Sequence, residues 1–387
     1  MRSIGNISKR LPRNDGKPVF IVTSMPIKKE QTMDIATFKQ ILEIAFEKRV
    51  SDIHFEVDNP PLFRARGHLI RSKLKNLTNK DTEFLADTVL QQCNRKLPED
   101  LREFDMSYTL PDVGRFRASI FRQRGNIGIV MRVIPHDIGT FKELHLPPAL
   151  GKIVQAPNGL ILVTGPTGNG KSTTMASMIR FINDNFNYNV ITIEDPIEFL
   201  FSSNKSCIIQ REVSIDTESF SGALRAAMRM DPDVIMVGEM RDLETIDACI
   251  KAAETGHLVL STLHTHNAAA TINRIVGYFP SQAQDIIRQR LAEMLVATVS
   301  LKLVTDKSGE YLVPVVEVMY STSTIKACIR EGHLDEIEQY IEKGRDEYGM
   351  QTFDQHLIEL CKQDRITMDE AKRISRSTDL ERKFMYY

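Results

Sequence analysis

The sequence predicts an α/β protein with a compact α+β domain over residues 33–135 and a parallel α/β domain over residues 149–387. Three observations support this fold class. The first part contains short runs that alternate apolar and polar residues, as half-buried antiparallel strands do. In the second part, continuous apolar runs alternate with helical segments, which is typical of a parallel sheet buried on both faces. The length of 387 residues is enough for two or three domains.

The composition is that of an ordinary globular protein. Apolar residues are 42% and charged residues 26% of the chain, which excludes a disordered or collagen-like protein. The formal net charge of −1 provides no dominant basic field for nucleic acid, so we expect no nucleic-acid partner. The five cysteines form no CxxC pair, so neither a structural zinc site nor a disulfide framework is predicted. No apolar run approaches the roughly 18–20 residues of a membrane span, and a cytoplasmic location is expected.

The first part of the chain is divided into an extension and a folded region. Residues 1–32 are polar and basic with no sustained period, and we expect a flexible extension there. The elements predicted after it are helices over 35–48 and 79–94 (the second capped by Thr78), strands over 51–56, 106–110, 115–122 and 127–134, and a hairpin of 62–66 and 68–71 around Gly67.

A linker is predicted over residues 136–148, which hold Gly139 and two consecutive prolines and show no firm period. Beyond it, four apolar runs are expected as buried strands, and the chain turns helical from about residue 281. The predicted strands cover 160–163, 190–193, 234–237 and 258–260, and the predicted helices cover 282–303, 322–330, 335–343, 352–363 and 368–375.

The strongest chemical signal is the run GPTGNGKS, which fits the pattern GxxxxGK[ST], follows a predicted strand and opens a helix. Glycines let the backbone wrap a phosphate, and the loop amides and helix N-terminus then face the anion. The pattern predicts that Lys171 bridges the β- and γ-phosphates of a nucleotide and that Ser172 holds Mg²⁺. The predicted nucleotide-binding residues are Gly165, Pro166, Thr167, Gly168, Asn169, Gly170, Lys171, Ser172 and Thr173.

Two acidic clusters follow other apolar runs. Glu239 ends the run DVIMVGE and is placed to orient an attacking water, directly or through Mg²⁺. Glu198 belongs to the run TIEDPIE and could bind water or metal, whereas helix capping and turn formation are the alternative role for that cluster. Because ligands bind beyond the carboxyl ends of parallel strands, both clusters and the glycine-rich loop are expected at one edge of the sheet.

A histidine-rich run, GHLVLSTLHTHN, surrounds another apolar strand. His257 precedes this strand and His264 follows it. His264 and His266 have a spacing that metal ligands use, but no third ligand lies nearby in the sequence. The alternatives are a sensor that bonds the γ-phosphate or an adjacent subunit, and histidines that serve the core or a helix cap.

Arginines are frequent on the strands of the first domain. The two-residue period of a strand places Arg115 and Arg117 on one face and Arg122 and Arg124 on the other. With Arg132, they are either solvated surface groups or a source of positive charge for a phosphoryl group held by another domain or subunit.

Together the motifs resemble the secretion ATPases of type II secretion and type IV pili, and within them the PilT/PilU pilus-retraction branch. The resemblance covers about residues 33–375. It is carried by GPTGNGKST, TIEDPIEF, DVIMVGEMRD and GHLVLSTLHTHNAA, in the order of the family, and by SDIHFEV, GRFRASIFRQRGNIGIVMR and GMQTFDQHLIEL.

The resemblance implies a RecA-like ATPase domain after a smaller PAS-like domain, and a homohexameric ring with ATP between the two domains. ATP and Mg²⁺ are the implied ligands, and hydrolysis would remove pilins from the base of the fibre. In the family pattern, the catalytic residues are Lys171, Glu239 and Glu198, the histidine-box pair is His257 and His264, and the arginine contacts are Arg117, Arg132 and Arg241.

Within the family, the chain is more similar to retraction ATPases because it has no tetracysteine element and only residues 1–32 precede the match. The accessory paralogue PilU is favoured by TIKACIRE at 324–331, an acidic helix over 333–348, and LKL at 301–303 in place of a Gln-rich stretch. Implied partners are a PilT paralogue and the inner-membrane pilus platform protein. The alternatives are a type II secretion or pilus-assembly ATPase, a nucleic-acid-translocating ATPase, and a ring subunit that turns over little nucleotide.

Overall fold

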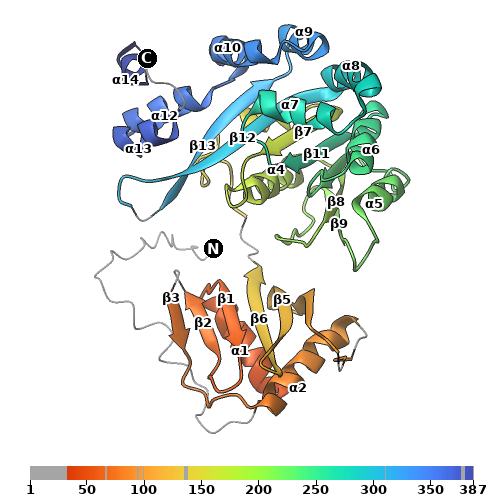
Figure 1. Cartoon of the computed structure of the whole chain (residues 1–387), viewed down its shortest axis with the longest axis vertical. Coiled ribbons are helices and arrows are strands. Elements are labelled where there is room, and N and C mark those ends of the chain that lie inside the picture. The colour runs from red at the N-terminus through yellow and green to blue at the C-terminus, as the bar shows by residue number, and fades with distance from the viewer. Residues whose placement is uncertain are drawn as a thin grey trace, which may run out of the picture. The chain divides into compact units, whose positions relative to one another are not determined.

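The computed structural model describes residues 33–65, 68–93, 96–98, 100–134, 138–309, 311–375 and 380–386. The chain forms two compact units, which divide between Ile134 and Pro135 (Figure 1). The predicted extension over 1–32, Gly67 at the expected hairpin turn and the first two residues of the predicted linker lie outside the described residues.

The N-terminal unit is a six-stranded antiparallel sheet with two helices. The strand order is β3-β2-β1-β6-β5-β4. The elements are α1 (Ile35–Glu47), β1 (Asp52–Phe55), β2 (Leu62–Ala65), β3 (His68–Arg71), α2 (Asn79–Leu90), the 3₁₀ turn η1 (Gln91–Cys93), β4 (Glu103–Leu110), β5 (Gly114–Gln123) and β6 (Asn126–Ile134). All of the elements predicted from the sequence for this unit are therefore confirmed, although the second helix becomes a 3₁₀ turn after Leu90 and Asn94 lies outside the described residues.

Local sequence explains where these helices begin and which face they bury. Asp34 caps α1 by accepting a hydrogen bond from the Thr37 amide. Thr78 and Asp81 form a reciprocal capping box at the start of α2. The buried stripe of α1, which includes Phe38, packs with inward-facing strand residues such as Phe116 in one apolar core.

The C-terminal unit contains a seven-stranded sheet with the order β13-β12-β7-β11-β10-β8-β9. Six neighbouring strands are parallel, and only the edge strand β13 is antiparallel to its neighbour. The strands are β7 (Gly159–Thr164), β8 (Asn189–Glu194), β9 (Cys207–Glu212), β10 (Val234–Val237), β11 (Leu258–Leu263), β12 (Leu295–Thr305) and β13 (Leu312–Tyr320).

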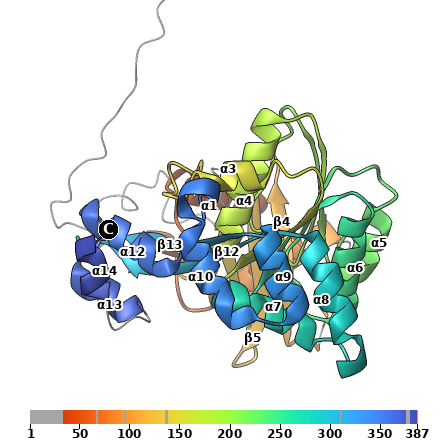
Figure 2. The same cartoon turned by 90° about the horizontal axis from the view of Figure 1, so that it is seen from above.

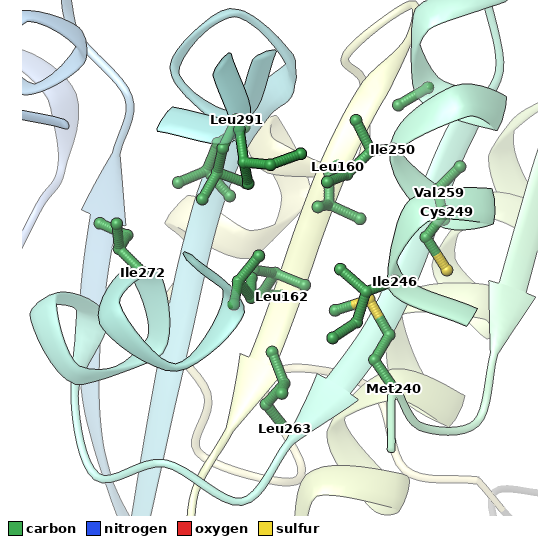
Figure 3. Packing of buried hydrophobic residues seen from close by; sticks show 14 of the residues in the cluster. Leu160, Leu162, Met240, Ile246, Cys249, Ile250, Val259, Leu263, Ile272 and Leu291 are labelled. Carbon is green, nitrogen blue, oxygen red and sulfur yellow. The ribbon is translucent and has the colours of Figure 1, made fainter. Parts of the chain in front are cut away.

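Helices cover both faces of this sheet, with α3 and α4 on one side and α6 to α9 on the other (Figure 2). Leu160 and Leu162 of β7 face Ile246, Ile272 and Leu291, which belong to α6, α7 and α8 (Figure 3). The helices are α3 (Ala149–Ile153), α4 (Lys171–Asn185), α5 (Phe220–Ala227), α6 (Leu243–Glu254), α7 (Ala268–Gly277), α8 (Gln284–Met294), α9 (Ser323–Glu331), α10 (Ile337–Lys343), α11 (Arg345–Tyr348), α12 (Phe353–Lys362), α13 (Met368–Ile374) and α14 (Leu380–Tyr386), with 3₁₀ turns η2 (Ser281–Ala283) and η3 (Leu334–Glu336).

Two helix predictions are wrong in this unit. The helix expected over 282–303 ends at Met294, and the chain continues as β12, which is buried between β7 and β13 and is rich in β-branched residues. The acidic helix expected over 333–348 is three short pieces, η3, α10 and α11, and Gly344 separates the last two. Strands β9 and β13 were not predicted from the sequence. The four predicted buried strands are confirmed as β7, β8, β10 and β11.

A buried histidine connects α12 to the edge of the sheet. The Val316 amide of β13 donates to Nδ1 of His356 at 2.9 Å. Burial, and then the charge of Arg345, lower the pKa of His356 from 6.5 to about 4. His356 is therefore a neutral acceptor in the folded protein.

We expect His356 to make the unit sensitive to acid. Its contribution to stability is complete above pH 6.5 and is lost as the pH falls toward 4, because the unfolded chain binds the proton first. The loss amounts to about 3 kcal/mol. Urea unfolding between pH 4 and pH 7 measures this dependence. Glu194 and Glu317 contribute the opposite pH dependence of stability. Their pKa values are raised to about 7, so the folded protein favours their protonated forms and gains stability from them as the pH falls.

The variant His356→Asn isolates this effect, because its Oδ1 atom can accept from the Val316 amide but does not titrate. The difference in unfolding free energy between parent and variant should shift in favour of the variant as the pH falls. A difference that stays constant between pH 4 and pH 7 would contradict the assignment.

Among the residues that the structure describes, no helix combines the length and apolar character needed to cross a bilayer.

Candidate functional site

The glycine-rich loop connects the carboxyl end of β7 to the first turn of α4, as predicted. Gly165 has a φ of +146°, and a Cβ atom there would lie 2.5 Å from the backbone oxygen of Leu301. Gly170 caps α4 in the left-handed conformation, with a φ of +83°. Glycine is required at Gly165 by close packing and at Gly170 by backbone conformation. The result is a loop whose backbone leads directly into the N-terminus of a 15-residue helix.

Lys171 lies inside this loop. Its Nζ atom donates to the backbone oxygens of Gly165 at 2.9 Å and Pro166 at 3.1 Å. Burial lowers the pKa of Lys171, and the negative charge of Glu198 opposes that shift. Glu198 is exposed, and its electrostatic effect on Lys171 means that the carboxylate predicted in the run TIEDPIE lies near the loop lysine. Ser172 and Thr173 follow in the first turn of α4 and are half-buried.

Strand β12 supports the loop from one side, which the sequence did not reveal. The backbone amide of Leu303 donates to Oδ1 of Asn169 at 2.8 Å. The Asn169 side-chain amide also donates to the backbone oxygens of Pro166 and Thr167, each at 3.3 Å. Asn169 was predicted only as part of the glycine-rich loop, because residues 295–303 were expected to be helical.

The catalytic candidate Glu239 and the histidine-box residue His264 meet at the carboxyl ends of the neighbouring strands β10 and β11. Nε2 of His264 lies 3.2 Å from Oε2 of Glu239, and Nδ1 of His264 lies 3.3 Å from Oγ1 of Thr167. Arg241 forms an ion pair with Glu239 through the other carboxylate oxygen. The histidine therefore connects the carboxylate that follows β10 to the glycine-rich loop.

The charge state of His264 fits this arrangement. Burial, and then the charges of Lys171 and Arg241, lower its pKa below the ordinary value. A neutral imidazole has one donor and one acceptor nitrogen. The hydrogen-bond network assigns the donor role to Nε2, facing the Glu239 carboxylate, and leaves Nδ1 to accept from the Thr167 hydroxyl.

A second carboxylate in the run TIEDPIE is more deeply buried than Glu198. Glu194 ends β8, and burial raises its pKa to about 7. Its Oε1 atom accepts hydrogen bonds from Thr192 at 2.6 Å and from Gln210 of β9 at 3.1 Å. Sequence reasoning assigned the role in this motif to Glu198. The signal for Glu194 was its position as the last residue of an apolar strand.

The structure does not bring His257 to the edge of the sheet where Glu239 and His264 meet. His257 precedes β11, whereas His264 follows it, so the two side chains lie at opposite ends of the same strand. Nδ1 of His257 lies 2.9 Å from the Ala252 backbone oxygen, at the end of α6. Its contacts are those of a capping residue, which was one of the alternatives.

Arg117 and Arg132 belong to the N-terminal unit. They stand opposite each other on β5 and β6. Arg132 donates to Asp52 at 2.9 Å, and Arg117 lies 3.5 Å from Asp105. Arg124 is not on a strand face as expected, because it lies in the turn after β5 with a φ of +52°. The role of Arg117 and Arg132 at the phosphates stays a prediction.

Within the described ranges, no group of three or more histidine, cysteine, aspartate or glutamate side chains is arranged to hold a metal ion. The four cysteines whose side chains the structure describes, Cys207, Cys249, Cys328 and Cys361, are all free thiols.

Comparison with known proteins identifies the family. Residues 28–373 match the family model described as type II/IV secretion system protein. The type IV pilus retraction ATPase PilT of Pseudomonas aeruginosa is 41% identical over 340 residues, which are 88% of this chain and 97% of that protein. The type IV pilus ATPase PilU of the same organism is 36% identical over 334 residues, which are 86% of this chain and 87% of that protein.

A solved structure agrees with this result. The crystal structure of the pilus retraction motor PilT with bound ADP superposes with a TM-score of 0.80, at 43% identity, and covers 88% of this chain and 99% of that one. The predicted fold class is thereby confirmed, with a RecA-like ATPase domain that follows a smaller α+β domain. The chain belongs to the type II/IV secretion system protein family, and within it is an ATPase of the PilT/PilU type.

Proposed function

We propose that this protein is a motor ATPase that uses ATP hydrolysis to drive retraction of a type IV pilus. The observation that carries the proposal is 41% identity over nearly the whole length of a pilus retraction ATPase. The nucleotide site supports the chemical part of the proposal, because the glycine-rich loop, Glu239 and His264 meet at one edge of the sheet.

In the proposed reaction, Lys171 exchanges its loop carbonyl partners for phosphate oxygens of ATP and offsets their charge. Glu239 orients the attacking water as its proton acceptor. His264 holds Glu239 and, through Thr167, connects it to the loop that surrounds the phosphates. The water is therefore oriented from the same network that contacts the triphosphate.

The residues present fit a Mg²⁺ ion that accompanies ATP. Ser172 supplies a hydroxyl in the first turn of α4, directly after Lys171. Glu198 and Glu239 supply carboxylates at neighbouring strand ends, and oxygen ligands of this kind are those that Mg²⁺ prefers. Once bound, the cation would neutralise charge on the phosphate oxygens.

The proposal extends to assembly and location. The protein forms a homohexamer at the cytoplasmic side of the inner membrane, where it acts on the platform protein at the pilus base. The accessory PilU role, with a PilT paralogue as partner, rests on two departures from the sequence pattern of PilT, LKL at 301–303 and TIKACIRE at 324–331. The third departure does not support it, since the acidic helix over 333–348 is not continuous.

A gene deletion in the source bacterium tests the retraction role. We expect deleted cells to keep surface pili but to lose retraction or twitching motility, and wild-type protein to restore them. Protein carrying Lys171→Ala should fail to restore them, whereas Lys152→Ala, which changes an exposed lysine in the same unit, should succeed. Loss of surface pili on deletion would indicate an assembly ATPase instead.

Purified full-length protein tests the remaining parts. Native mass should correspond to six subunits, and the ATPase rate measured with and without a PilT paralogue distinguishes an accessory from an autonomous motor. Stimulation of hydrolysis by DNA would contradict the proposal and favour a translocase.

A further inference from the structure

A buried carboxylate lies in the core of the ATPase unit, outside the residues assigned above. Glu317 of β13 is 4% exposed. It stands opposite Ser300 of β12, and Ser300 stands opposite Thr164, the last residue of β7. The register of three neighbouring strands thus aligns three polar side chains in one buried row that ends directly before Gly165.

These side chains form a continuous hydrogen-bonded chain. The Thr164 hydroxyl donates to Oγ of Ser300 at 3.1 Å, and the Ser300 hydroxyl donates to Oε1 of Glu317 at 3.1 Å. Thr164 and Ser300 are fully buried. These hydrogen bonds therefore connect β7, the strand that leads into the glycine-rich loop, to the edge strand β13.

The same oxygen of Glu317 also holds the start of α7. The Ala268 backbone amide donates to it at 2.8 Å, while the cap residue Asn267 accepts from the Ala270 amide. The first amides of a helix have no partner within the helix, and negative charge is favourable at that end. Two acceptors from different elements thus fix the first turn of α7, which follows the segment from His264 to Asn267.

Stability alone does not explain a glutamate in this position. Burial raises the pKa of Glu317 to about 7, which shows that the charged form is disfavoured there. Within the part of the chain that the structure describes, Glu317 has no ion-pair partner within 4.0 Å. An apolar side chain of similar volume at such a position is often as stabilising as a buried polar one.

We propose that Glu317 is a positioning residue for ATP hydrolysis, which fixes the start of α7, and with it the segment from His264 to Asn267, against the strand end that carries the phosphate-binding loop. Glu317 acts through His264, which contacts both Glu239 and Thr167. The inference rests on the ATPase activity and is independent of the pilus role.

Steady-state ATPase measurements on the full chain test the proposal. Glu317→Leu should lower kcat by about tenfold or more, with KM for ATP within about twofold of the parent value. Glu317→Gln keeps an oxygen that can accept from the Ala268 amide, so it should retain most of kcat. A Leu variant with parental kcat, or Leu and Gln variants that are equally impaired, would overturn the proposal.

A second pair of variants, both on β12, tests the positioning role of Glu317 even if Glu317→Leu does not fold. Ser300→Ala removes the hydrogen bonds that connect Thr164 to Glu317, and it should lower kcat by about threefold, in line with the net value of one hydrogen bond. Thr298→Val is the matched control, because Thr298 is fully buried two residues earlier on the same strand and, in the described structure, its hydroxyl has no hydrogen-bond partner. Equal kcat values for these two variants would show that the hydrogen bonds from Thr164 through Ser300 to Glu317 play no part in hydrolysis.

A double-mutant cycle tests the route through His264. If Glu317 acts by positioning the His264 segment, Glu317→Leu should reduce kcat much less in a His264→Ala background than in the parent. The same fold-reduction in both backgrounds would show that Glu317 does not act through His264.

Discussion

Replacing Lys171 with alanine is expected to lower the rate of ATP hydrolysis by roughly a thousandfold. Lys171 is the cation inside the phosphate loop, and its Nζ atom bonds only the backbone oxygens of Gly165 and Pro166 among the described residues. No core contact depends on that charge, so the fold should persist. Phosphate release from ATP by the purified full-length protein measures the effect.

The control for this prediction is Lys152→Ala, which removes an exposed lysine from α3 of the same unit. It should hydrolyse ATP at the parental rate, and both variants should have unfolding midpoints close to that of the parent. Hydrolysis by Lys171→Ala protein at the parental rate would show that the phosphates bind elsewhere.

Glu239→Gln is expected to lower kcat by about a hundredfold to ten-thousandfold, while nucleotide binding remains. The amide keeps the size of the side chain but accepts a proton poorly, so the attacking water loses its base. Glu239 is also held by His264 and Arg241 rather than by the phosphate loop itself, which separates its role from that of Lys171. Fluorescent-nucleotide binding and single-turnover hydrolysis distinguish the two effects.

Glu218→Gln serves as the matched control, because Glu218 is an exposed carboxylate of the same unit. The control should hydrolyse ATP like the parent. If Glu239→Gln lost nucleotide affinity and hydrolysis by equal factors, Glu239 would be a binding residue and not the base.

The parallel core of the sheet was predictable because each chemical motif directly follows a buried apolar run. The loop at Gly165, the carboxylate Glu239 and His264 each follow such a run, and the carboxyl ends of parallel strands lie at one edge. The same rule would have favoured Glu194 over Glu198 as the buried carboxylate of its motif, and it places His257 at the opposite end of β11.

Strand β12 was not predictable by periodicity, because apolar residues occupy both of its faces. A continuous apolar run cannot be distinguished from a buried helix by period alone. The usable signal was its β-branched content, in Val296, Thr298 and Val299 among others. The roles of Asn169 and Glu317 were hidden for the same reason, since both depend on the register of β12.

The position of β12 has a mechanical consequence for the distant end of the chain. The amide of Leu303 holds the nucleotide loop, and only two residues farther along the amide of Thr305 donates to Glu370 of α13 at 3.2 Å. Lys302, between Leu301 and Leu303, lies 4.2 Å above the ring of Phe353 in α12. Strand β12 therefore contacts both the glycine-rich loop and the C-terminal helices α12 and α13. We expect a movement of the loop during ATP turnover to act on these helices through this one strand, and load on the helices to act back on the loop.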